Sequence, residues 1–288
     1  MSNLKNPFAP FDKDLNNALE KNVSEAILED FGKGDATTKI IAKDKIIKAK
    51  VVSREYAVLC GTPWFDAVLK KIDPKIKIIW NYCEGDIIET NTELCEISSS
   101  AKSLLSAERT ALNFLQFLSG VATLTLKYVK KISGTNVIVL DTRKTVPGLR
   151  LAQKYAVRVG GGANQRLSLN DGILIKENHI FIFGSISESI KGASLNNLNT
   201  PIQIEVENLI ELNEAIEAGA KSIILDNFSI DNILKAVKIS NNRVQLEVSG
   251  GVNLDNIKLI AETGVDRISV GELTKNIKSI DFSLRFLN

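Results

Sequence analysis

The chain has 288 residues, 44% of them hydrophobic, a length that suffices for one large domain or two ordinary ones around a sizeable core. Its 36 Lys and Arg nearly balance its 34 Asp and Glu, and the net charge of +2 excludes a generally polybasic protein that coats nucleic acid or anionic membranes. Charges of both signs interrupt residues 1–22 and no later segment approaches the length of a membrane span, so we expect a cytoplasmic protein that binds neither membrane nor nucleic acid.

The N-terminal part of the chain has the pattern of a β-rich domain. Residues 39–64 mix β-branched residues with alternating charges and turn residues, which is typical of strands in an antiparallel or mixed sheet. The three cysteines, Cys60, Cys83 and Cys95, are odd in number, widely spaced and without nearby histidines. This pattern argues against a disulfide framework and against a zinc cluster, and we expect reduced, partly buried thiols.

The pattern becomes helical near residue 100. From Ser103 to Lys131 apolar residues recur at helical spacing, and Gly120 is a candidate break, so the segment predicts one long helix or two in succession. Beyond it, short apolar runs alternate with amphipathic segments. These runs, which we interpret as strands, are residues 137–141, 173–176, 202–206, 222–226, 244–248 and 266–270.

The last four of these strands begin 20, 22 and 22 residues apart, a rhythm of one strand and one helix per unit. Between two of them lies a helical segment with Asn208 as its expected N-cap and Gly219 near its end. Buried strands joined by helices predict a parallel sheet, and this many in succession indicate a TIM-like barrel or an incomplete version of it. A flat doubly wound sheet is the alternative, although the glycine-rich nucleotide turn expected after its first strand is missing.

Charged and small residues follow these strands, at the edge where parallel α/β folds place their chemistry. Cations come after the early strands, carboxylates after the middle ones and small residues after the late ones. A buried ion costs several kcal/mol unless it is paired or meets a ligand, so the set predicts a binding site; mutual pairing that closes the barrel mouth is the alternative. The residues are Asp141, Arg143, Lys144, Lys176, Glu205, Glu207, Asp226, Ser249, Gly250, Gly251 and Gly271.

Residues 141–176 hold seven cations and two acids, a local excess that predicts an anionic ligand. Arg150, Lys154 and Arg158 recur every fourth residue, and we interpret them as a solvated helical stripe. The other four cations, Arg143, Lys144, Arg166 and Lys176, lie next to strand ends or follow three glycines, where they suit carboxylate and phosphate oxygens. The late glycine loops, SGGV and SVGE, predict a phosphate site built from backbone N–H groups.

The segment DTRKTVPGLRLAQKYAVRVGGGANQRLSLNDGILIKENHI closely resembles the signature of quinolinate phosphoribosyltransferases, the carboxylating nicotinate-nucleotide pyrophosphorylases. The resemblance extends over nearly the whole chain, with LEDFGKGDATT, REYAVLCG, AERTALNFLQFLSGVAT, IEVEN, ILDNF and VSGGV as further matching segments. It implies a mixed α/β N-terminal domain, residues 1–115 with a returning tail of residues 275–288, and an incomplete TIM-like α/β barrel, residues 116–274.

The resemblance further implies that phosphoribosyl pyrophosphate and quinolinate give nicotinate mononucleotide, pyrophosphate and CO2 in de novo NAD synthesis, with Mg²⁺ as cofactor. The implied catalytic residues are Lys144, Lys176, Glu205 and Asp226, and the two carboxylates would also hold the metal, directly or through water or substrate. Arg109 would reach the neighbouring subunit's site in a homodimer with shared active sites, or in a higher oligomer. The implied substrate-binding residues are Arg109, Arg143, Lys144, Gln165, Arg166, Lys176, Glu205, Asp226, Ser249, Gly250, Gly251 and Gly271.

One position departs from the family pattern, GGGxNHR, because Gln165 stands where the family has histidine. Glutamine can hydrogen-bond a carboxylate but cannot carry a proton or a positive charge, so we expect activity with altered quinolinate affinity. We interpret the single histidine, His179, as structural.

Three other functions compete with this interpretation. A ModD-like paralogue of the same fold would act on a different substrate, but the retention of five family cations argues against it, namely Arg109, Arg143, Lys144, Arg166 and Lys176. A Schiff-base aldolase would use Lys144 or Lys176, although the paired arginines are better explained by a dianionic substrate. An RNA-binding protein would use the local basic patch, but this patch contains a single aromatic residue, Tyr155.

Overall fold

The structure is a computed structural model that describes residues 12–32, 34–41, 45–196 and 200–287. Residues 1–11, which contributed to the expectation of a cytoplasmic protein, lie outside the described residues. The chain divides into two compact units. We call the first the barrel unit, with described residues 127–145, 162–196 and 200–275, and the second the sheet unit, with described residues 12–32, 34–41, 45–126, 146–161 and 276–287.

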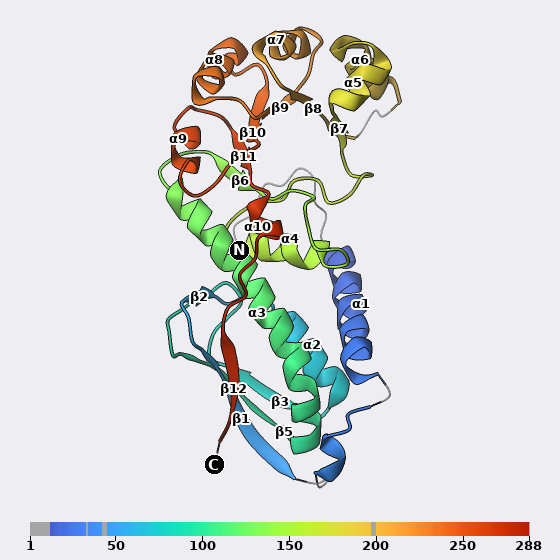
Figure 1. The fold of residues 1–288 in the computed structure, drawn as a ribbon, viewed down its shortest axis with the longest axis vertical. Helices are drawn as coiled ribbons and strands as arrows, with labels where there is room; N and C mark the ends of the chain where they lie inside the picture. Colours follow the sequence, from blue (N-terminus) through green and yellow to red (C-terminus); the bar gives the residue numbers. More distant parts are fainter. Residues whose placement is uncertain (1–11, 33, 42–44, 197–199, 288) are drawn as a thin grey trace. The chain divides into compact units, whose positions relative to one another are not determined.

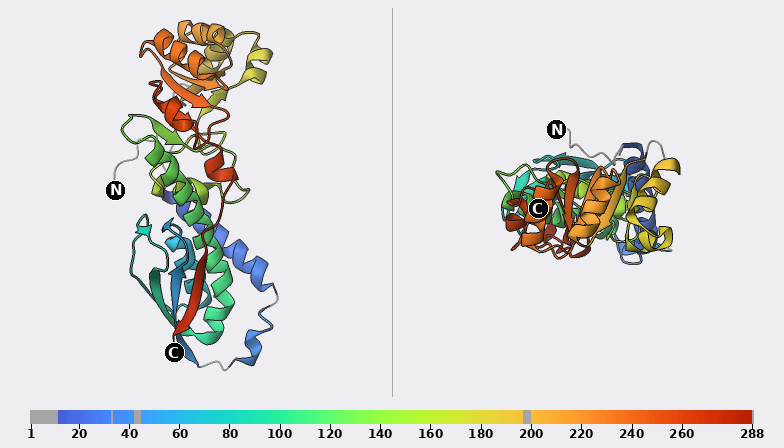
Figure 2. Two further views of the ribbon diagram at one scale, coloured as in Figure 1. Left: turned by 60° about the vertical axis from the view of Figure 1, so that its left-hand side comes forward. Right: turned by 90° about the horizontal axis from the view of Figure 1, so that it is seen from above.

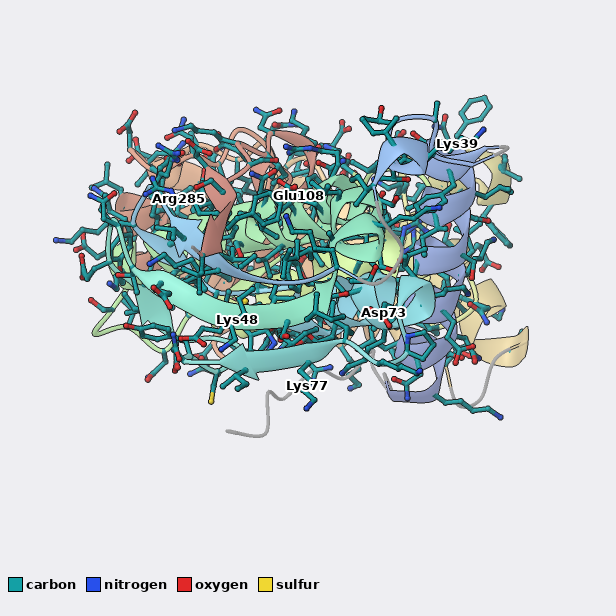
Figure 3. All side chains as sticks on the ribbon, turned by 90° about the horizontal axis from the view of Figure 1, so that it is seen from below. Lys39, Lys48, Asp73, Lys77, Glu108 and Arg285 are labelled. Atoms are coloured by element: carbon teal, nitrogen blue, oxygen red, sulfur yellow. The ribbon has the colours of Figure 1, made fainter. Side chains whose placement is uncertain are left out.

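The sheet unit is built on a four-stranded antiparallel sheet in the order β12 (Phe282–Leu287), β1 (Ile46–Ser53), β5 (Glu93–Ser100) and β3 (Lys77–Trp80). A short pair, β2 (Ala57–Val58) and β4 (Ile87–Ile88), lies apart from it. The helices of this unit are α1 (Asp12–Phe31), α2 (Thr62–Ile72), α4 (Arg150–Val159), the 3-10 helix Thr38–Ile40 and most of α3 (Ala101–Lys131). Figure 3 shows charged side chains such as Lys48, Lys77 and Arg285 on its strands, and all three are exposed.

Helix α3 is continuous, so the alternative of two successive helices is wrong. Its apolar face consists of Leu104, Ala107, Ala111, Leu115 and Leu118, all nearly or fully buried at helical spacing. Gly120 does not break the helix. It lies where the chain returns, and a Cβ atom there would be only 2.5 Å from the backbone oxygen of Lys278.

The barrel unit contains a parallel sheet with all six strands predicted from the sequence. Their order is β6 (Ile138–Leu140), β11 (Arg267–Ser269), β10 (Gln245–Ser249), β9 (Ser222–Asp226), β8 (Ile202–Val206) and β7 (Ile173–Ile175). In the described ranges β6 and β7 do not pair with each other, so the sheet is open and the incomplete barrel is confirmed. In Figure 1, α6, α7 and α8 follow the outer side of this curved sheet, and Figure 2 gives two further views.

Short helices connect the strands of the barrel unit. They are α5 (Glu177–Phe183), α6 (Ile186–Asn196), α7 (Leu209–Glu217), α8 (Ile230–Ser240), α9 (Ile257–Ala261) and α10 (Glu272–Lys275). Asn208 is the N-cap of α7, as predicted, and its side-chain oxygen accepts hydrogen bonds from the backbone N–H groups of Ile210 and Glu211. Gly219, just beyond this helix, has a φ of +87°. Among the described helices none has both the length and the apolar character that a membrane span requires.

The prediction of a solvated stripe on α4 is wrong. Lys154 is completely buried, and Arg150 and Arg158 are only partly exposed. Spacing at every fourth residue shows that three side chains share one face of a helix, but it does not show what covers that face. These cations therefore belong to the packed interior and margin of the sheet unit.

Candidate active site

A cavity of about 420 Å³ lies at the carboxyl ends of the parallel strands in the barrel unit. Ten of the residues predicted for the site line it together, because the loops after neighbouring parallel strands meet at one edge of the sheet. These residues are Arg143, Lys144, Gln165, Arg166, Lys176, Glu205, Asp226, Ser249, Gly250 and Gly251.

Four predicted residues do not line this cavity, namely Asp141, Glu207, Gly271 and Arg109. Asp141 is completely buried and accepts hydrogen bonds from Asn164 and Gln165, and Glu207 is exposed. Gly271 lies beside the cavity, and a Cβ atom at this position would contact the side chain of Lys144 at 3.4 Å. Arg109 is an exposed residue of α3 in the sheet unit, whereas the cavity belongs to the barrel unit.

The cations of the cavity include donors that are free to bind an anion. Arg166 is 9% exposed and uses Nη1 to donate to the carbonyl oxygen of Gly172 at 3.0 Å. Burial, together with the nearby charge of Arg143, lowers the pKa of its guanidinium. The Nε–H group of Arg143 is buried and has no acceptor among the described residues. A buried charged donor without an acceptor is costly, so its position favours a bound anion.

Lys176 and Glu205 form an ion pair across the ends of β7 and β8. The Nζ–Oε2 distance is 2.6 Å, and the side chain of Glu205 is 12% exposed. Lys176 is also the N-cap of α5, where its backbone N–H donates to Nδ1 of His179 at 3.0 Å. His179 is exposed and does not line the cavity, so its hydrogen bond supports the start of the helix.

The loop after β10 lines the cavity with two glycines, Gly250 and Gly251. Gly250 has a φ of +91°, and a Cβ atom here would be 2.1 Å from the side-chain oxygen of Asn227. Only glycine fits this position. Asn227 in turn donates from Nδ2 to Asp226 Oδ2 at 2.8 Å, which holds that carboxylate beside the glycine loop.

A buried polar network that was not predicted from the sequence forms part of the cavity wall, where Gln165, Glu247 and Ser269 line the cavity. Glu247 is completely buried, and its carboxylate accepts hydrogen bonds from Gln165, Gln203 and Ser269. Gln165 is fixed at both ends of its amide, because its Nε2 donates to Glu247 at 2.9 Å and its Oε1 accepts the backbone N–H of Arg166 at 2.8 Å.

A signal for this network is present in the sequence. The strands IQIEV and VQLEV each place Gln and Glu two residues apart among apolar residues, which orients both polar side chains to one face. Two strands with the same alternation indicate a polar face inside the barrel, and Glu247 belongs to it.

The cavity therefore combines cations with carboxylates and a glycine loop. Such a site can bind a small polyanion and hold carboxylate oxygens near it. The described residues include no group of three or more His, Cys, Asp or Glu that could hold a metal by themselves. Glu205 and Asp226 nevertheless fit Mg²⁺, because this ion binds oxygen ligands and commonly uses one or two carboxylates together with substrate phosphates.

Comparison with known proteins identifies relatives over almost the whole chain. Residues 35–119 match the model of the quinolinate phosphoribosyl transferase N-terminal domain, and residues 121–285 match that of the C-terminal domain. A protein of Bacillus subtilis (strain 168), described as a probable carboxylating nicotinate-nucleotide pyrophosphorylase, is 38% identical over 267 residues, which are 92% of each chain. One of Methanocaldococcus jannaschii with the same description is 40% identical and covers 92% of this chain and 95% of its own.

A solved structure supports the same relationship. The nicotinate-nucleotide pyrophosphorylase from Francisella tularensis superimposes with a TM-score of 0.92 and 46% sequence identity. The superposition covers 94% of this chain and 97% of that one. The comparison thus includes both units of the chain.

Proposed function

Because the chain belongs to the quinolinate phosphoribosyltransferase family, we propose that it transfers the phosphoribosyl group of phosphoribosyl pyrophosphate to quinolinate with loss of CO2. The products are nicotinate mononucleotide, pyrophosphate and CO2, and the reaction is a step of NAD biosynthesis. The observation that carries the proposal is the unpaired Nε–H of Arg143, which among the described residues faces no acceptor although it lies in a cavity with three further cations.

Arg143, Lys144 and Arg166 would bind the two carboxylates of quinolinate. A guanidinium pairs with a carboxylate through two parallel hydrogen bonds, so the arginines would orient the pyridine ring as well as attract it. Arg166 is held by its bond to Gly172, and Lys176 is held by its bond to Glu205. Cations fixed in this way need little reorganisation when the substrate enters.

The carboxylates and the glycine loop would bind the other substrate. Glu205 and Asp226 suit the ribose hydroxyls and the positive charge that develops on the ribose as pyrophosphate leaves. Bound Mg²⁺ would be held by the same two residues, directly or through water or substrate, and would neutralise the leaving group. Ser249, Gly250 and Gly251, with Gly271 nearby, would hold the 5′-phosphate through backbone N–H groups.

Decarboxylation needs positioning more than a separate acid or base. Bond formation to ribose makes the ring nitrogen cationic, and this charge stabilises the carbanion left when CO2 departs from the neighbouring carbon. One proton taken up from solvent then replaces CO2 on that carbon. Gln165 fits this mechanism, because its amide orients neighbours without exchanging a proton. The protein contributes binding, orientation and exclusion of water.

We further propose a cytoplasmic homodimer. On α5, next to the cavity, Phe181, Ile182 and Phe183 are 87%, 79% and 52% exposed, and three consecutive exposed apolar residues favour burial against another subunit. Arg109 is exposed as well and could then reach the cavity of a second subunit. Analytical ultracentrifugation of the wild type and of Phe181→Asp tests the dimer, which the variant should dissociate.

The reaction is tested by incubating the purified protein with Mg²⁺, phosphoribosyl pyrophosphate and either quinolinate or nicotinate. CO2 and nicotinate mononucleotide are followed together. We expect equal amounts of both from quinolinate and no reaction of nicotinate. Formation of nicotinate mononucleotide from nicotinate without CO2 would show that quinolinate is not the substrate. No reaction with quinolinate or with nicotinate would mean that the site catalyses another reaction.

Two variants make this experiment specific. Arg166→Met removes a charged donor from the cavity and should raise the KM for quinolinate by about ten- to a hundredfold, as loss of one charge-assisted contact predicts. Arg243→Met removes an arginine that bonds Glu217 outside the cavity and should leave the KM unchanged. Equal effects of the two variants would contradict the assigned role of Arg166.

A further inference from the structure

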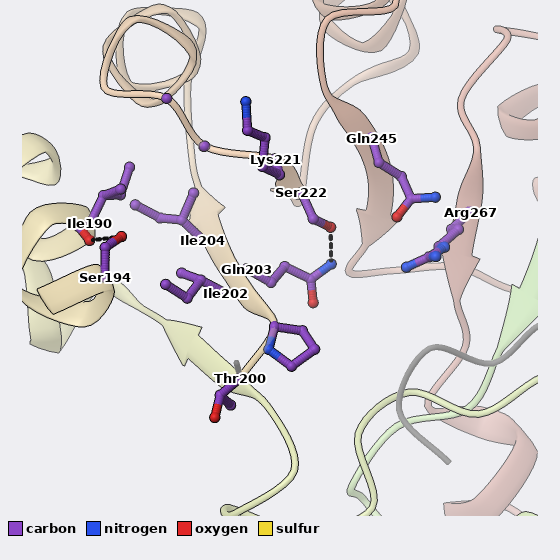
Figure 4. A pocket seen from close by; sticks show the side chains of 13 residues that line it. Ile190, Ser194, Thr200, Ile202, Gln203, Ile204, Lys221, Ser222, Gln245 and Arg267 are labelled. Carbon is purple, nitrogen blue, oxygen red and sulfur yellow. Dashed lines mark hydrogen bonds between the residues drawn. The ribbon is translucent and has the colours of Figure 1, made fainter. Parts of the chain in front are cut away.

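A second cavity, of about 590 Å³, lies at the opposite, amino ends of the same parallel strands (Figure 4). The first residues of four adjacent strands line it, namely Ile202, Ser222, Gln245 and Arg267. The proposed active site lies beyond the other ends of these strands. The two cavities share no lining residue.

Arg267 is the unusual residue of this cavity. The residue is only 8% exposed, yet within the described ranges no hydrogen bond or ion pair occupies its guanidinium. Figure 4 shows Arg267 and Gln245 pointing into the space faced by Gln203 and Ser222. The guanidinium has five N–H donors and stays charged. Its nitrogens are not among the fully buried polar atoms without a partner, so they border the open cavity, where water or a ligand supplies their acceptors.

The buried carboxylate of Glu247 does not supply this acceptor. Burial lowers the pKa of the Arg267 guanidinium, and the nearby charges of Glu247 and Asp266 offset part of this effect. The oxygens of Glu247 bond Gln165, Gln203 and Ser269, and Glu247 forms no ion pair with Arg267 in the described part of the chain. The nearby negative charge therefore explains why Arg267 is tolerated at this position. It does not explain why the N–H donors of Arg267 face an open cavity.

The rest of the cavity fits a small organic anion. Lys221 adds a second cation at its margin, where its side chain is exposed, and Gln245 adds an amide beside Arg267. The opposite wall is apolar and includes Ile202 and Ile204. A ligand whose oxyanion binds Arg267 would thus place its apolar body against this opposite wall.

We propose that this cavity binds a small organic anion, a carboxylate or phosphate group on an apolar body, with Arg267 as its anchor and with an effect on the active site. Gln203 is the connection between the two cavities. Its Nε2 donates to Ser222 at 3.1 Å and to Glu247 at 2.9 Å, and its Oε1 accepts from Gln165 at 2.9 Å. A ligand that moves Gln203 would also move Gln165, which lines the active site.

Binding is tested with fluorobenzoate as the probe, followed by fluorine NMR in the presence of saturating quinolinate. We expect millimolar binding that quinolinate does not displace. Arg267→Met should weaken it at least about tenfold, whereas Arg243→Met, a change of an exposed arginine outside the cavity, should leave it unchanged. Absence of quinolinate-resistant binding, or equal binding by the two variants, would overturn the site.

A second variant separates ligand binding from folding. Lys221→Glu reverses a charge at an exposed position, so it should fold normally and still weaken the probe severalfold. Unchanged binding by this folded variant would contradict the proposed anion site. Competition by inorganic phosphate distinguishes the head groups: displacement of fluorobenzoate shows a site for phosphate and carboxylate alike, whereas retention restricts the proposal to carboxylates.

The effect on the active site rests on the proposed function and has its own measurement. Fluorobenzoate should change the KM for quinolinate at least about twofold in the wild type and not in Arg267→Met. Binding of fluorobenzoate with an unchanged KM for quinolinate would overturn the coupling between the two cavities, but it would not contradict the second binding site. If quinolinate is not turned over at all, the proposed function fails, and the NMR comparison of the Arg267 and Arg243 variants still decides whether the second site exists.

Discussion

At the scale of single residues, Gln165 shows how a neutral side chain can hold a position inside a charged site. Its amide donates to the buried carboxylate of Glu247 and accepts the N–H of Arg166, so each end of the amide has a fixed partner. Arg166 is thereby placed by a residue that carries no charge. The function of this position is orientation, which glutamine performs at any pH at which the protein folds.

Replacing Gln165 by leucine should destabilise the protein. The change leaves Glu247 with one donor fewer and removes the acceptor of the Arg166 N–H, and each lost partner of a buried polar group costs about 1–3 kcal/mol. Urea unfolding monitored by circular dichroism measures the difference. An unchanged free energy of unfolding would mean that water or a neighbouring group replaces the amide.

The cysteines should differ in reactivity. Burial raises the pKa of the Cys60 thiol well above its usual range and that of Cys95 to about 12, whereas Cys83 is exposed. A raised pKa lowers the fraction of thiolate, which is the reactive nucleophile. The two buried thiols are therefore protected both by their low accessibility and by their low thiolate fraction. At about pH 8 iodoacetamide should modify Cys83 in the folded protein and all three cysteines after unfolding in guanidinium. Mass spectrometry of the intact protein and of its peptides measures this, and early modification of Cys60 or Cys95 would contradict their burial.

At the scale of elements, α3 shows why a glycine within a helix need not end it. The helix continues through Gly120 because many buried side chains on either side stabilise it, and the missing side chain leaves space for the returning backbone at Lys278. The sequence alone left this segment open between one helix and two. The deciding contact lies 158 positions further along the chain, beyond the reach of local periodicity.

Gly120→Ala should destabilise the protein although alanine favours helices by about 1 kcal/mol. The new methyl group would lie 2.5 Å from a backbone oxygen, and overpacking of this kind costs about 1–3 kcal/mol. Gly192→Ala in α6 is the matched control, because its methyl group meets the outer edge of the half-exposed Phe183 ring, which can move. We expect a lower melting temperature for the first variant and little change for the second; the reverse order would contradict the explanation.

The sequence predicted the repeated elements better than their surroundings. Six short apolar runs, the last four of them at regular spacing, suffice to predict the parallel strands, and residues just after those strands gather at one edge by geometry. The burial of Lys154 could not be predicted, because it depends on what packs against α4. The role of Glu247 could not be predicted from the residues that follow the strands, because this carboxylate lies within β10 and bonds Gln165 in the barrel interior.

At the scale of the whole molecule, the chain leaves the sheet unit for the barrel unit and returns to it at its C-terminus. Strand β12 pairs antiparallel with β1, from Phe282 opposite Ser53 to Leu287 opposite Lys48. The tail therefore covers one edge of β1, whose other edge pairs with β5, and protects it from pairing with other chains. Residues at opposite ends of the sequence thus depend on each other for stability.

The two phenylalanines of β12 test this dependence on the same strand. Phe282 is 3% exposed, so Phe282→Ala should cost about 3–5 kcal/mol, as for other fully buried phenylalanines. Phe286 is 50% exposed, and Phe286→Ala should cost about 1 kcal/mol because half of its apolar surface is already in water. Chemical unfolding measures the stabilities, and limited proteolysis shows whether the tail detaches. If Phe282→Ala detaches the tail, the free edge of β1 should also promote aggregation, whereas equal, small losses in both variants would mean that the tail is not anchored by its buried ring.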